Sequence, residues 1–205
     1  MGLPVDTRSR ARNGSTASRI LEVAERLVQS RGYNAFSYAD VAAELRVTKA
    51  ALHYHFAGKA ELGEALLSGY VARFAESLAA IDAEPADAPR KLVAYADLYL
   101  DVLQRQQMCL CGMLAAEFQT LPEPMRAIVL GFFNDQETWL SRVLEQGRRE
   151  GTLHFTGSTG EAARLVVAAL EGAMLVARPY GDVSRFHDAA TALIAGLRSD
   201  SPAER

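Results

Sequence analysis

The residues best suited to chemistry gather in one stretch, between Ser37 and Lys59. Thr48 carries a hydroxyl that can cap a helix and also contact a phosphate. Lys49 follows it directly, and Tyr54 stands further along the same expected helix. Such side chains on one short helix can contact phosphates and base edges in a major groove. The spacing therefore predicts a helix that binds DNA.

Two short helices joined by a tight turn must position these side chains, and we expect them at 38–45 and 48–55. A small residue, Ala42, lets the two helices cross closely, and Leu52, ten positions later, fixes the second helix to a core. This layout is typical of a helix-turn-helix. The candidates for reading base edges are Lys49, Ala50, Ala51 and Tyr54. The candidates for contacts near the phosphate backbone are Ser37, Tyr38, Arg46, Thr48, His53 and Lys59.

The same residues also fit a plainer interpretation, in which the two helices are only part of an all-α core. Tyr54, His55 and Phe56 would then pack as ordinary core aromatics, and for Phe56 we prefer that interpretation. Three arginines near the N-terminus, Arg8, Arg10 and Arg12, either enter a flanking minor groove or belong to a solvated tail.

Charge is unevenly distributed along the 205 residues. Residues 1–60 hold nine Lys or Arg against five Asp or Glu, a net charge of +4, whereas the remainder holds 13 against 20, a net charge of −7. A basic N-terminal part suits a phosphate backbone, and the acidic remainder does not. We therefore expect a DNA-binding domain at 1–60 and a second domain at 61–205.

Helical periodicity dominates the whole chain, so the predicted fold class is all-α. Beyond the first two short helices and a preceding one at 16–31, apolar residues repeat at helical spacing over several longer segments. These expected helices are 59–81, 90–106, 109–120, 125–150, 161–177 and 183–197. An N-terminal three-helix module followed by a C-terminal helical bundle is the expected architecture.

Composition excludes several classes of protein. Two cysteines are too few for a disulfide scaffold, and no apolar run is long enough to span a bilayer, so we expect a cytoplasmic protein without a membrane contact. No phosphate loop, nucleophile elbow or metal-ligand cluster appears, and His53 and His55 diverge on a helix. We therefore expect no enzyme, no cofactor and no metal. A helical adaptor, or a small-molecule or thiol-chemistry protein without DNA binding, remains the alternative.

Residues 16–66 resemble the DNA-binding part of the TetR family of transcriptional regulators. The residues that carry the resemblance are Phe36-Ser37-Tyr38, Val41-Ala42, Val47-Thr48-Lys49, Leu52-His53-Tyr54-His55-Phe56, Lys59 and Leu62. Family members usually have glycine in place of Arg46 and often tyrosine in place of His53. A left-handed conformation at Arg46 would cost roughly 1 kcal/mol relative to glycine.

The resemblance implies a helical body that binds a small-molecule effector and forms a homodimer on a double-stranded operator, with repression in the absence of effector. Apolar, aromatic and polar residues interleave in the body, which suits an organic ligand, although most such residues simply pack. The pocket candidates are Tyr95, Tyr99, Cys109, Met113, Glu117, Phe132, Phe133, Gln136 and Trp139. The segment around Cys109 also resembles a branch of the family that includes a repressor responsive to N-ethylmaleimide.

Two properties of the body are left open by the residues. Cys109 stands where a helix is expected to begin, which would lower the pKa of its thiol; the alternative is a buried, inert thiol. Small residues in the last two helices permit close pairing with a second copy, or only with each other. The candidates for the dimer interface are Val166, Leu170, Ala173, Phe186, Ala190, Leu193 and Ile194.

Overall fold

The structure is a computed structural model that describes residues 7–198, with the side chains described from residue 16 onward. The predicted all-α class is confirmed, because this range contains α- and 3-10 helices and no strand beyond an isolated bridge between Leu153 and Arg198. None of the helices in the described range is both long and apolar enough to cross a membrane.

Three helices form the N-terminal module: α1 (Thr7–Arg31), α2 (Tyr38–Leu45) and α3 (Lys49–His55). Their shared core is made of fully buried side chains, among them Ile20, Ala24, Val28, Val41 and Leu52. The expected α2 and α3 are confirmed, but α1 begins nine residues earlier than the expected Thr16. That extension has few apolar residues, so periodicity could not reveal it. The side chains of Arg8, Arg10 and Arg12 lie outside the described residues.

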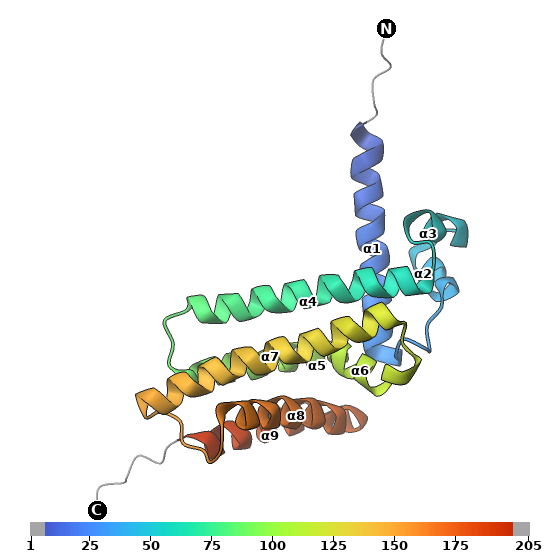
Figure 1. The fold of residues 1–205 in the computed structure, drawn as a ribbon. Coiled ribbons are helices and arrows are strands. Elements are labelled where there is room, and N and C mark those ends of the chain that lie inside the picture. Colours follow the sequence, from blue (N-terminus) through green and yellow to red (C-terminus); the bar gives the residue numbers. More distant parts are fainter. Residues whose placement is uncertain (1–6, 199–205) are drawn as a thin grey trace, which may run out of the picture.

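The long helix α4 (Lys59–Ala83) joins this module to the body, where it packs against α5 (Ala88–Gln104) and α7 (Glu123–Glu150). In Figure 1, α1 crosses the first part of α4 steeply, and α4 and α7 run alongside one another. A short linker joins α4 to α5 and ends at Asp87. The carboxylate of Asp87 caps α5 by accepting a hydrogen bond from the Arg90 backbone N–H at 2.9 Å.

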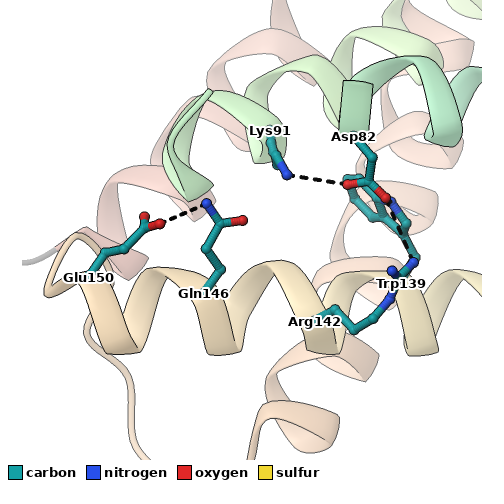
Figure 2. Close-up of polar contacts among 6 residues, drawn as sticks. All are labelled: Asp82, Lys91, Trp139, Arg142, Gln146 and Glu150. Carbon is teal, nitrogen blue, oxygen red and sulfur yellow. Dashed lines mark hydrogen bonds and ion pairs between the residues drawn. The ribbon is translucent and has the colours of Figure 1, made fainter. Parts of the chain in front are cut away.

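Polar contacts fix the far end of α4 to its neighbours (Figure 2). Asp82 accepts a hydrogen bond of 3.0 Å from the indole N–H of Trp139 on α7. The other carboxylate oxygen, Oδ1, lies 3.3 Å from the Lys91 ammonium on α5. The guanidinium of Arg142 lies 3.8 Å from Oδ2, the oxygen that bonds to Trp139. One carboxylate therefore joins three helices at the point where α4 ends.

The rest of the body consists of α6 (Leu110–Ala116), the 3-10 turn η1 (Phe118–Thr120), α8 (Thr159–Ala177), the 3-10 turn η2 (Arg178–Tyr180) and α9 (Ser184–Leu197). The helix α8 lies between α7 and α9, which places it on the side of the body away from α4 (Figure 1). Ser158 and Glu161 form a capping box at its start.

Candidate nucleic-acid interface and ligand pocket

The turn between α2 and α3 depends on a left-handed residue. Arg46 has φ 56° and ψ 44°, and the backbone N–H of Val47 donates to the carbonyl of Ala42 at 3.0 Å. Thr48 then caps α3, its hydroxyl oxygen accepting from the Ala51 backbone N–H at 3.2 Å. The turn and the cap together set the direction in which α3 leaves the module.

One side of α3 is open to solvent. Tyr54 is 75% exposed, the largest value among the big apolar side chains of the described range, and Lys49 and Ala50 are also exposed. Ser37 and Arg46 are exposed nearby, while Ala51 is half-buried. A lysine and a tyrosine that project from a short helix have the reach and the hydrogen-bonding groups for a DNA groove.

Three of the predicted DNA contacts instead bond within the chain. Tyr38 is buried and its hydroxyl donates to the carbonyl of Phe56 at 3.0 Å. The Lys59 ammonium donates to the carbonyl of Phe36 at 2.6 Å, and burial lowers the pKa of this amine. These two side chains hold α3 and α4 in place, so they are poorly placed to contact DNA. The exposed ring of His53 also bonds within the chain, its Nδ1 lying 3.1 Å from the carbonyl oxygen of Ala57.

Five of the predicted pocket residues form a packed cluster in the body: Tyr95, Tyr99, Phe132, Gln136 and Trp139. The hydroxyls of both tyrosines donate to Gln136 Oε1, that of Tyr99 at 2.8 Å. Trp139 stacks on Tyr95 with the ring centroids 5.6 Å apart. Because burial strongly disfavours the phenolates, it raises the pKa of both tyrosines. These side chains fill the space between α5 and α7.

Cys109 is buried as well, with 1% of its surface exposed. Its sulfur accepts from the Gly112 backbone N–H at 3.4 Å and from the Tyr70 hydroxyl at 3.7 Å. Burial raises the pKa of this thiol well above its usual value, and the neighbouring carboxyl of Glu171 raises it further. The expectation that a helix start would lower the pKa is therefore wrong, since desolvation outweighs the hydrogen bond from Gly112.

Glu117 does not lie in a pocket. Its carboxylate accepts from the backbone N–H groups of Tyr33 at 2.6 Å and of Asn34 at 3.2 Å, just after α1. Gly32 precedes them with φ 92°, and a Cβ there would collide with this carboxylate. At the other end of α6, the Met108 backbone N–H donates to the carbonyl of Gln29. Both ends of α6 are thus bonded to the end of α1.

A pocket of about 480 Å³ opens between α6, α7 and α8. Of the predicted ligand-binding residues, Met113 and Phe133 line it. The sequence interpretation missed Glu171, whose carboxyl group lies in the wall of the pocket. No sequence signal marks it, because an isolated glutamate on a helix usually points to solvent.

Two family models match the chain, one described as bacterial regulatory proteins, tetR family, over residues 20–66, and one as tetracyclin repressor-like, C-terminal domain, over residues 88–193. The crystal structure of a TetR-family regulator from Agrobacterium tumefaciens has a TM-score of 0.88 and 31% identity, covering 91% of this chain and 100% of that one. The chain belongs to the TetR family. It is a DNA-binding transcriptional regulator and not an enzyme.

Two curated members of the TetR family match different lengths of the chain. The repressor NemR of Escherichia coli is 26% identical over 167 residues, which cover 80% of this chain and 84% of NemR. The regulator TtgR of Pseudomonas putida is 36% identical over 99 residues, 44% of this chain. That match spans only 46% of the length of TtgR. Members of the TetR family bind DNA operators and small-molecule effectors, usually as dimers.

The residues predicted for the dimer interface of this TetR-family chain are mostly internal. Val166, Leu170, Phe186, Ala190 and Ile194 are buried against the chain's own core, and Ala173 and Leu193 are half-buried. These five buried side chains are not free to form an interface surface. On α8 the exposed apolar side chains are instead Leu165, Leu175 and Val176. They lie on a different side of the same helix and face outward, a distinction that composition does not reveal.

Proposed function

We propose that this regulator is a dimeric repressor that binds a palindromic operator and is released when a small organic molecule, electrophiles included, occupies its body. The observation that carries the proposal is the exposed face of α3, in a module that α4 joins to a body with an open pocket. Lys49 and Tyr54 read base edges, and Ser37, Arg46 and Thr48 contact the phosphate backbone. The DNA-binding domain spans 1–60 and the effector and dimerisation domain 61–205.

The helix α6 supports a physical route from effector to DNA. Gly112 and Met113 on this helix line the pocket, and Glu117 at its end bonds to Tyr33 and Asn34 of the DNA-binding module. A ligand that moves α6 must either break these bonds or move the end of α1 with it. The ligand and the operator then favour different positions of the same helix, which makes their binding mutually unfavourable.

The dimer provides the reason why small movements matter. Two recognition helices must stand about 34–36 Å apart to enter successive major grooves. The exposed Leu165 and Val176 on α8, which do not line the pocket, support this helix as part of the contact between two copies. Rotation of each N-terminal module relative to that contact changes the spacing, and the pair then no longer fits its operator.

Fluorescence anisotropy against labelled DNA from the gene's own upstream region tests the proposal, with scrambled DNA as the control across a salt series. Lys49→Ala and Tyr54→Ala should weaken selective binding, by about 1–3 kcal/mol for a side chain that reads a base. Arg90→Ala, which removes an exposed cation from the body, should leave binding unchanged. Equal binding of both DNAs, together with no effect of Lys49→Ala on a pool of genomic fragments, would contradict the proposal.

A further inference from the structure

The pocket between α6, α7 and α8 combines an apolar wall with the carboxyl group of Glu171, a half-buried residue whose Oε1 atom is buried. Met108, Met113, Phe133 and Leu175 contribute apolar and polarizable surface. Glu171 projects from α8 toward α6, and its Oε1 is buried without a hydrogen-bond partner. A buried carboxyl oxygen without a partner is costly unless something else satisfies it. Something that enters this pocket can supply the missing donor.

The chain makes room for this carboxyl group at Gly112. A Cβ at that position would collide with Glu171 Oε2, so only glycine allows the carboxyl group to lie against α6. Burial raises the pKa of this carboxyl group to about 7, and the neighbouring side chain of Cys109 has a smaller effect that lowers it. Glu171 therefore changes its charge near neutral pH, and a nearby cation would hold it in the ionised form.

The other charged and titratable groups around Glu171 leave it without a buried cation as a partner. From α4, α5 and α6 the groups that interact with it electrostatically are Tyr70, Tyr95, Tyr99, Cys109 and Cys111. From α7 and α8 the pocket lining adds Glu137 and the solvent-exposed Arg164. The exposed guanidinium of Arg178 lies 3.4 Å from the sulfur of Met113 and also bonds to the Ser30 carbonyl, so it is held at the edge of this wall. Within the lining itself, two carboxyl groups against the one exposed guanidinium of Arg164 favour a positively charged occupant.

We propose that this pocket binds an organic amine, whose ammonium group donates to Glu171 while its apolar body lies against Met113 and Phe133. The inference rests on the proposed effector-responsive function and names the chemical class of the effector. A charge-assisted hydrogen bond satisfies the buried oxygen. Since Gly112 and Met113 belong to α6, the amine binds on the helix that holds Glu117 against the DNA-binding module.

Isothermal titration calorimetry with three ligands of matched shape tests the proposal: phenethylamine, phenethyl alcohol and phenylacetic acid. The full-length protein should bind the amine about tenfold or more tightly than the alcohol, and the acid least. Affinity for the amine should rise about tenfold between roughly pH 6 and pH 8, as the Glu171 carboxyl with a pKa of about 7 ionises while the amine stays charged.

Variants identify the responsible carboxyl group. Glu171→Gln should abolish the preference for the amine and its pH dependence, whereas Glu137→Gln, in the same pocket, should retain both. Gly112→Ala keeps Glu171 but displaces its carboxyl group, so it should also reduce the preference, and it provides a second test if Glu171→Gln does not fold. Equal binding of amine and alcohol by the unaltered protein would overturn the proposal, as would a loss of preference only in Glu137→Gln.

The anisotropy assay separates this inference from the proposed function. Operator binding that is insensitive to the amine, with no amine preference in calorimetry, overturns only the effector class. Amine preference in a protein that does not select its operator overturns the proposed repressor function and leaves the chemistry of the pocket intact.

Discussion

Replacing Arg46 with glycine should stabilise the folded protein and lower its affinity for DNA. Arg46 adopts φ 56° and ψ 44°, which costs a residue with a Cβ roughly 1–2 kcal/mol. Glycine avoids that cost but loses about 0.4–1 kcal/mol through the greater freedom of the unfolded chain. The net gain should be about 1 kcal/mol, which for a chain of this length corresponds to a rise in Tm of about 2–4 °C.

The control is Arg46→Ala, which removes the same charge but keeps the strained backbone. The Arg46 side chain is exposed, so its truncation should cost little by itself. Thermal unfolding followed by circular dichroism should therefore give Arg46→Gly a higher Tm than Arg46→Ala. The difference should correspond to the whole net gain of about 1 kcal/mol from the backbone. If Arg46 contacts a phosphate, both variants should reduce the slope of log affinity against log salt by about 1.

The two measurements isolate the two roles of the residue. A glycine variant no more stable than the alanine variant would refute the account of the turn. An unchanged salt slope in both variants would remove Arg46 from the DNA contacts and leave the backbone argument untouched.

Three further changes test other parts of the molecule. Glu117→Ala leaves two backbone N–H groups without their acceptor, so it should lower stability by about 1–2 kcal/mol and weaken the coupling between effector and operator, as measured by operator titrations with and without effector. Cys109 in the folded protein should react with iodoacetamide much more slowly than in urea, since burial raises its pKa and closes access; mass spectrometry showing equal rates would contradict the described environment. The folded-state pKa of Glu171 is raised from an ordinary 4.5 to about 7, so the folded state binds the extra proton and its stability should fall as pH rises between these values. In denaturant titrations, the free energy of unfolding of Glu171→Gln should rise relative to that of the unaltered protein across that pH window, by at most about 3 kcal/mol. A difference in unfolding free energy that does not change with pH would show that Glu171 does not titrate there.

Most of the helices were predictable because amphipathic periodicity is a local property. The helices α2 and α3 follow from Ala42, Leu52 and Thr48, and the structure gives each the expected position. The start of α1 was not predictable, since residues 7–15 contain too few apolar residues to show a repeat. Periodicity reports which side of a helix is apolar, and a polar extension has no such side.

The candidate sites were predictable only in part, because a sequence does not show which partner a side chain meets. Tyr38 and Lys59 are residue types that often contact DNA, yet here their polar groups donate hydrogen bonds to backbone carbonyl groups of the chain itself. Tyr95 and Trp139 suited a pocket equally well, and here they pack against each other. Glu171 was not predicted as a site residue, although its carboxyl group lies in the pocket. Its pKa is raised because α6, which lies far away in sequence, packs against it.

The contact between Asp82 and Trp139 gives the protein a built-in optical probe (Figure 2). Trp139 is the single tryptophan of the chain, so all indole emission comes from one site. That site touches the last turn of α4, the helix whose first turn borders the DNA-binding module. Emission from an indole depends on the charges beside it, so withdrawal of the Asp82 carboxylate should change the signal. Movement of α4 can therefore be followed in unlabelled protein, in real time, while effector or operator is added.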